Sequence, residues 1–213
     1  MITAISTVNW KVAWKKQSFI VQFLITFLLL IGIVITIPYF FDYVQHRDGK
    51  IINDPLLNLI GPVNLSPVTF TLIYSSLFIS VVYLFFYPER LLLLMQGYCL
   101  LTIFRVICMW LVPLDNPPGL IVLQDPFTVM VGYGGTVITK DLFFSGHVST
   151  MFLLFLCVHQ TTLKKILLTC TILIACFILM QHVHYTIDVL AAPFFSWLAV
   201  RCVQIIFHKN NSV

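Results

Sequence analysis

Long apolar runs alternate with short polar stretches along almost the whole chain. They predict six helices, at residues 18–41, 67–87, 90–112, 145–160, 165–182 and 185–207. A helix needs roughly 20 apolar residues to cross the bilayer core, so we interpret the runs as membrane spans. The fourth and fifth runs are short, and their ends could be embedded in protein instead of lipid. The predicted fold is all-α: a six-span transmembrane helical bundle, preceded by an interfacial segment over 1–17 and followed by a tail over 208–213.

The composition supports this interpretation. Of the 213 residues, 60% are hydrophobic and 9% are charged, whereas soluble domains carry about 25% charged residues. These values exclude a soluble globular protein and leave no room for a separate soluble domain. The first apolar run is too long for a cleavable signal peptide, and no small-residue cleavage site follows it. We expect the membrane bilayer and lipids as partners, and no nucleic acid.

Charged residues are distributed unevenly between the two sides of the predicted bundle. An even number of spans places both termini on one side, where the only acidic residue is Glu89 and the basic residues are Lys11, Lys15, Lys16, Arg90, Lys164, Lys165, Arg201 and Lys209. The long loops 42–66 and 113–144 lie opposite and are richer in acids. The positive-inside rule then predicts cytoplasmic termini. We interpret the glycines at 132–135 as turns, with a phosphate-cradling or substrate-covering loop as the alternative.

Two polar segments interrupt the apolar background. Residues 141–147 read Asp-Leu-Phe-Phe-Ser-Gly-His, and residues 182–188 read His-Val-His-Tyr-Thr-Ile-Asp. His184 and Asp188 are four residues apart, which on a helix puts both on one face within hydrogen-bond reach. The topology places His147 at the outer end of the fourth span and the other pair between the fifth and sixth spans, so that all three meet at one exoplasmic level. Two imidazoles and a carboxylate are suited to nucleophilic and acid–base catalysis.

Ser145 is a predicted N-cap of the fourth span. Free backbone N–H groups and the helix dipole favour an anion at such a position, and Gly146 lets the backbone approach that anion closely. His147 would then face a bound phosphate. Each motif also has a purely structural interpretation. The Ser-Gly-His motif could be a polar helix cap, and the His184–Asp188 motif could be a structural hydrogen-bonded pair. The types of side chain also allow a zinc site, with the ligands His147, His182, His184 and Asp188.

Other polar residues are expected near this level. Arg105, in the third span, either binds phosphate or pairs with an aspartate. Asp141 either caps a helix or steers a cationic headgroup, and Lys140 could supply positive charge to a phosphate. His182 has a structural or supporting role beside the substrate, and Tyr185 contacts phosphate or packs.

Several of these residues carry a resemblance to a known family. The Asp-x-x-x-Ser-Gly-His motif at 141–147 and the His-Tyr-Thr-Ile-Asp-Val motif at 184–189 resemble the sphingomyelin synthase branch of the type-2 phosphatidic acid phosphatase superfamily. So do Arg-Val-Ile-Cys-Met-Trp at 105–110 and the Pro-Pro-Gly turn at 117–119. The resemblance covers residues 67–207 and implies six spans with an exoplasmic site.

The resemblance also implies roles. His184 would attack phosphorus to give a phosphohistidine, and Asp188 would hold its tautomer and stabilise the imidazolium. His147 would protonate the leaving oxygen and then act as base toward the acceptor. Neither a metal nor another cofactor is implied.

The chain departs from the family pattern in three ways. It lacks the Lys-x6-Arg-Pro element of the phosphatase branch, and Ile178 stands where that branch has an arginine. The charge of a phosphate must then be met by Arg105, Lys140 or His182, which fits a singly charged phosphodiester better than a dianionic monoester. Thr139 and Lys140 stand where the synthase branch usually has Cys-Gly, which bears on headgroup choice.

We therefore expect a lipid phosphotransferase that passes a phospho-headgroup from a phospholipid to a lipid alcohol, ceramide or diacylglycerol. A lipid phosphatase or phospholipase C-like hydrolase using the same residues is the alternative, and a noncatalytic transporter or assembly factor is the third. The expected location is the plasma or inner membrane with an exoplasmic site, or the Golgi or endoplasmic reticulum with a lumenal site in a eukaryote.

Overall fold

A computed structural model describes residues 9–123 and 138–207, and seven α-helices make up most of this part of the chain. They are α1 (Trp10–Ala13), α2 (Gln17–His46), α3 (Ser66–Phe85), α4 (Pro88–Leu111), α6 (Gly146–Cys157), α7 (Thr161–Met180) and α8 (Thr186–Phe207), with a 3-10 turn η1 at Leu57–Leu59. Extended pairing among the described residues is a single bridge between Lys50 and Leu114. The all-helical prediction is confirmed for this part. Residues 1–8 of the predicted interfacial segment, the glycines at 132–135 and the tail 208–213 lie outside the described residues.

Five helices are long and apolar enough to cross a membrane: α2, α3, α4, α7 and α8. They make the chain an integral membrane protein. The fourth predicted span, 145–160, instead forms a helix of 12 residues, α6. At 1.5 Å per residue this helix extends about 18 Å, well short of the roughly 30 Å bilayer core. The predicted count of six spans is therefore not confirmed.

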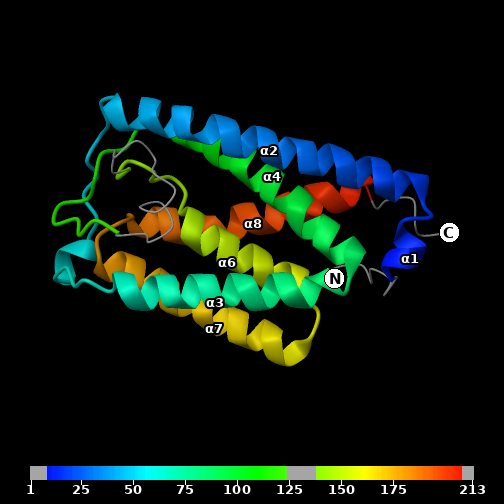
Figure 1. The fold of residues 1–213 in the computed structure, drawn as a ribbon. Helices are drawn as coiled ribbons and strands as arrows, with labels where there is room; N and C mark the ends of the chain where they lie inside the picture. The colour runs from blue at the N-terminus through cyan, green and yellow to red at the C-terminus, as the bar shows by residue number, and fades with distance from the viewer. Residues whose placement is uncertain (1–8, 124–137, 208–213) are drawn as a thin grey trace.

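The short helix α6 lies inside the bundle (Figure 1). It packs against α3, α4, α7 and α8, whereas α2 lies along the outside of α4. Only 6% of the residues in the most apolar stretch of α2 are buried, so most side chains of this helix point away from the rest of the bundle. The enclosure of α6 explains how a helix this short is tolerated at membrane depth, because its polar ends meet protein groups and not lipid.

Polar groups of α6 meet protein partners at the carboxyl end of the helix and along its length. At its carboxyl end, Nη1 of Arg90 donates a hydrogen bond to the carbonyl oxygen of Cys157 at 3.1 Å. A cation at this position also complements the helix dipole. Along the helix, Oγ of the buried Ser196 on α8 lies 2.8 Å from the carbonyl oxygen of Ser149. Small residues on α8 such as Ala192 and Ala199, both fully buried, allow the two helices to pack closely.

The loops gather at one end of the bundle, which we call the loop end; it consists of residues 47–65, 112–123, 138–145 and 181–185 (Figure 1). Backbone hydrogen bonds connect these loops: the N–H of Val63 donates to the carbonyl of Met180 at 2.8 Å, and that of Ile121 to the carbonyl of Gln181 at 2.9 Å. The opposite end, the turn end, consists of α1 and of the turns at 86–87 and 158–160. Which end faces the cytoplasm stays a prediction from the charge asymmetry.

Candidate active site

A buried carboxylate holds one imidazole at the loop end. His184 precedes α8 and Asp188 lies in its first turn, so the pair is formed by the turn into the helix and not by one helix face as predicted. Nδ1 of His184 lies 3.3 Å from Oδ2 of Asp188, and the two residues are 1% and 0% exposed. The same oxygen accepts a hydrogen bond from the backbone N–H of Tyr185 at 3.0 Å, the reach-back contact of a capping box. With Nδ1 turned to the carboxylate, Nε2 is the ring nitrogen left for chemistry.

The second imidazole comes from a distant segment. His147 is the second residue of α6, and its ring centroid lies 6.5 Å from that of His184, with the ring planes at 68°. Phe70 of α3 packs against His147 at 6.1 Å between ring centroids. The expected convergence of the two histidines is confirmed. Their separation is longer than that of two directly hydrogen-bonded rings.

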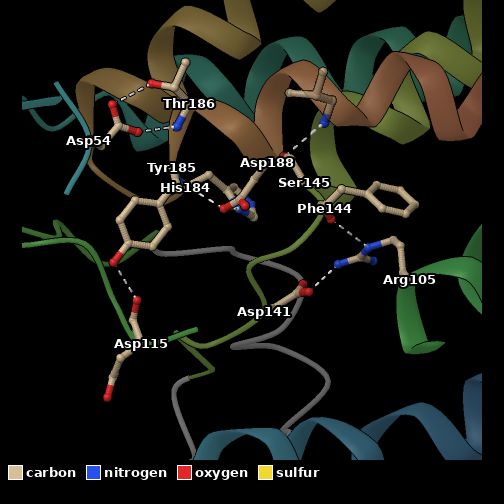
Figure 2. Close-up of polar contacts among 11 residues, drawn as sticks. Asp54, Arg105, Asp115, Asp141, Phe144, Ser145, His184, Tyr185, Thr186 and Asp188 are labelled. Carbon is tan, nitrogen blue, oxygen red and sulfur yellow. Dashed lines mark hydrogen bonds and ion pairs between the residues drawn. The ribbon is translucent and has the colours of Figure 1, made fainter. Parts of the chain in front are cut away.

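The start of α6 is fixed against the start of α8. Ser145 is the N-cap of α6, as predicted, and its Oγ accepts from the N–H of Val148 at 3.5 Å. The N–H of Ser145 donates to the carbonyl oxygen of Asp188 at 3.2 Å (Figure 2). This hydrogen bond joins the two polar segments directly, so the positions of His147 and His184 are coupled through the backbone.

Arg105 lies over the amino end of α6. Its guanidinium forms an ion pair with Asp141, and its Nε donates to the carbonyl oxygen of Phe144 at 3.3 Å (Figure 2). The ring of Phe144 stacks on Phe195 of α8 at 4.3 Å with an interplanar angle of 4°, which anchors the segment that carries this carbonyl. Arg105 thus pairs with an aspartate, one of the two roles foreseen for it.

Gly146 makes this approach of the guanidinium possible. A Cβ atom at this position would lie 2.5 Å from Cζ of Arg105 and 2.6–2.7 Å from its two terminal nitrogens. Real Cβ atoms do not approach other heavy atoms so closely, so only glycine fits while Arg105 stays where it is. Two sources of positive potential, the guanidinium and the amino end of the helix, therefore lie together at the start of α6.

The remaining predicted substrate residues use their polar atoms elsewhere. Nζ of Lys140 donates to the carbonyl oxygen of Arg47 at 2.9 Å and lies 3.3 Å from Oδ2 of Asp115. Oη of the fully buried Tyr185 donates to the carbonyl oxygen of Asp115 at 2.9 Å. Burial raises the pKa of this hydroxyl, so Tyr185 remains a donor at neutral pH. Substrate contacts by Lys140 and Tyr185 stay predictions.

His182 follows α7, two residues after its last residue, and joins two loops. Its φ of 55° is unusual for a residue other than glycine and suits the residue that follows a helix. Its Nδ1 lies 2.7 Å from the carbonyl oxygen of Pro118 and its Nε2 2.8 Å from that of Ile60. Substrate binding or zinc binding through the ring of His182 would have to replace one of these two contacts. Among the described residues, no group of three or more His, Cys, Asp or Glu side chains is arranged to hold a metal ion.

Asp54, which belongs to neither polar motif of the sequence, caps α8 from the first loop. Its two carboxylate oxygens accept from the backbone N–H of Thr186 at 2.6 Å and from the Thr186 hydroxyl at 2.9 Å (Figure 2). Burial would raise the pKa of Asp54, but the hydrogen bonds from Thr186, Leu56 and Leu57 outweigh it, and the pKa is lowered. Nothing in the local sequence marks Asp54 among the loop aspartates, because its partner is 132 residues away.

Comparison with known proteins places the polar segments in a family context. Residues 140–205 match the family model PAP2 superfamily C-terminal. The match supports the type-2 phosphatidic acid phosphatase superfamily and includes His147, His184 and Asp188, whereas Arg105 precedes it. Members of the PAP2 superfamily are phosphatases and phosphotransferases, which supports an enzyme that acts on phosphate esters. Neither a curated protein nor a solved structure gave a significant match.

Proposed function

We propose that this chain is a membrane lipid phosphotransferase of the sphingomyelin synthase type, which moves a phospho-headgroup from a phospholipid to ceramide or diacylglycerol. One observation carries the proposal: the ring centroids of two imidazoles from separate segments lie 6.5 Å apart, and a buried carboxylate contacts one of the two rings. The PAP2 match over the same residues supports phosphate-ester chemistry. The long apolar helices around the candidate site support a lipid substrate, because its acyl chains could lie along them. The reacting phosphate would then lie at the level of the loop end.

In the proposed first step, Nε2 of His184 attacks phosphorus, and the bond from phosphorus to the glyceride oxygen breaks. His147 gives its proton to that oxygen, so diacylglycerol leaves as a neutral alcohol. The attacking ring becomes positively charged, and Asp188 stabilises it through Nδ1–H. Because the carboxylate is fully buried, its charge acts in a medium that screens it less than water does.

In the proposed second step, His147 removes the proton from the hydroxyl of the incoming lipid alcohol. The resulting oxygen attacks phosphorus, and the bond from phosphorus to Nε2 of His184 breaks. Water in place of the alcohol would make the same machinery a hydrolase, so the identity of the acceptor is what separates the two activities.

The amino end of α6 supplies the proposed phosphate contact. Arg105 and the free N–H groups that start α6 can together neutralise one negative charge, as on a phosphodiester. In the structure, Asp141 occupies the guanidinium, so a substrate phosphate would compete with this internal carboxylate. This arrangement suits a monoanion, which needs fewer cations than a phosphate monoester.

A transfer assay tests the proposal. The protein is reconstituted in vesicles with headgroup-labelled phospholipids, with or without ceramide or diacylglycerol, and the labelled products are separated. Transfer to the alcohol supports the phosphotransferase, whereas release of a water-soluble phosphate or phospho-headgroup alone would identify the hydrolase. His184→Ala should abolish turnover, and His46→Gln serves as the matched control because this exposed histidine pairs only with Asp42 within the described structure.

A second experiment separates the roles of the two histidines. His147→Gln should fail with a natural phospholipid, whose alcohol needs a proton to leave, and should still react with a p-nitrophenyl phosphodiester, whose leaving group does not. Labelled enzyme should then accumulate, with the acid lability of a phosphohistidine. Equal loss of both reactions would rule out His147 as the acid of the first step.

A further inference from the structure

Two turns that are far apart in the sequence pack together at the turn end. Oη of Tyr83, near the end of α3, lies 3.0 Å from Nδ1 of His159, which lies between α6 and α7. The ring of Tyr87, between α3 and α4, meets the ring of His159 edge to face at 4.5 Å. Arg90 reaches across from α4 to the carbonyl of Cys157. This cluster is at the opposite end of the bundle from the candidate active site.

Two cations converge on this cluster. Arg90 uses Nη1 for the Cys157 carbonyl, and Lys164 extends over the ring of Phe155 with Nζ 4.6 Å from the ring centroid. Both side chains therefore reach the carboxyl end of α6, where Phe155 and Cys157 lie. Burial and the charge of Arg90 lower the pKa of His159, so this histidine adds no further charge at neutral pH and remains a neutral hydrogen-bonding group.

No carboxylate balances these charges within the described residues. Glu89, next in sequence to Arg90, pairs with Lys16 at 2.9 Å, and neither Arg90 nor Lys164 forms an ion pair there. Lys164 also lies in the first turn of α7, which contains no acidic residue. The carboxyl end of α6 offers Arg90 a partial negative charge, whereas the amino end of α7 favours a negative charge itself. Two cations and the amino end of a helix therefore lie together without a carboxylate among the described residues.

The side chains around Arg90 and Lys164 indicate which kind of anion would bind there. Beside the cluster, the large apolar side chains of Phe85, Phe86 and Ile166 are 57%, 70% and 52% exposed, as expected of residues that contact acyl chains. Basic pockets between membrane helices bind the headgroups of acidic lipids. We propose that Arg90, Lys164 and the amino end of α7 form a second lipid site, which binds the phosphate of an acidic phospholipid without reacting with it.

A binding measurement tests this site independently of the proposed function. The inactive His184→Ala protein is placed in nanodiscs that contain phosphatidylglycerol and phosphatidylcholine, and the retained lipids are counted by native mass spectrometry. Lys164→Gln should weaken the preference for phosphatidylglycerol about fivefold, since one interfacial cation contributes on the order of 1 kcal/mol. Lys164→Glu should weaken it further while preserving the melting temperature, because an acid suits the first turn of α7.

The matched controls are Lys15→Gln and Lys15→Glu, which change the same charge at an exposed lysine of the same end of the bundle. They should leave the lipid preference within twofold of the parent value, on the order of experimental error for a residue outside the site. Equal losses from both lysines would mean general attraction to a basic surface and would overturn the site. Displacement of the lipid by millimolar glycerol phosphate would overturn the assignment to a lipid and point to a soluble phosphate ester.

Discussion

The contact between Gly146 and Arg105 gives the sharpest test of the proposed phosphate site. In Gly146→Ala, the new Cβ would lie 2.5 Å from Cζ of Arg105, so the guanidinium must move. It is the far end of a flexible side chain, and alanine is a better helix former than glycine. We therefore expect the melting temperature to change little. Activity should fall, because the guanidinium no longer lies over the start of α6.

The size of the loss follows from the interaction that is displaced. A hydrogen bond to a charged group contributes about 1.5–3 kcal/mol, which corresponds to a decrease of about 10- to 150-fold in kcat/KM. The vesicle transfer assay measures this ratio for the variant and the parent protein. Gly32→Ala is the control, because a Cβ at this glycine of α2 would meet nothing within 4 Å.

A double-mutant cycle decides whether the effect passes through Arg105. If Gly146→Ala acts only by displacing the guanidinium, it should cost less than threefold in a protein that already carries Arg105→Gln, on the order of the 0.5 kcal/mol scatter of independent sites. Fully additive losses would show that Gly146 acts by another route. Full activity of Gly146→Ala would refute the inference that Arg105 binds phosphate from this position.

Three further predictions concern other parts of the loop end. Asp188→Asn should lower kcat by about 100-fold or more with the fold intact, because the imidazole loses its charged partner; full activity in the transfer assay would contradict its role. Asp54→Asn should weaken the cap on Thr186 by about 0.5–2 kcal/mol. Since the pKa of Asp54 is lowered from its ordinary value of 3.8, this stabilisation is present above that value and is lost as the pH falls through the lower folded-state pKa. Melting curves of parent and variant in detergent should accordingly differ at pH 7 and converge as the pH falls below the lowered pKa of Asp54. Tyr185→Phe removes the hydrogen bond to Asp115 and should cost about 0.5–1.5 kcal/mol of stability with kcat unchanged; a large fall in kcat would instead support the substrate contact predicted from the sequence.

The sequence located the residues of the candidate site better than the contacts that hold them in place. His147 lies in the motif at 141–147 and His184 and Asp188 in the motif at 182–188, and the alternation of apolar runs was enough to place both motifs at one end of the bundle. Ser145 was recognisable as an N-cap because a capping contact spans only a few residues. These inferences depended on local periodicity and on the direction of consecutive helices, both of which can be read along the chain.

Other features were decided by packing alone. Arg105 meets Asp141 across 36 residues, and Asp54 meets Thr186 across 132. The turn of the chain before α8, and not a helix face, brings His184 to Asp188. The run at 145–160 had the composition of a span, yet its neighbours enclose it as a helix of 12 residues.

The amino-acid sequence by itself thus determined the all-helical membrane fold and the residue types of the candidate site, because both follow from composition and from spacing within a few residues. Only the tertiary structure decided where the guanidinium lies, which loop aspartate caps α8 and where the unbalanced cations of the turn end meet. Each of these depends on the direction of side chains from helices distant in sequence, and an apolar helix has nearly the same pattern of residues whichever face it turns to its neighbours.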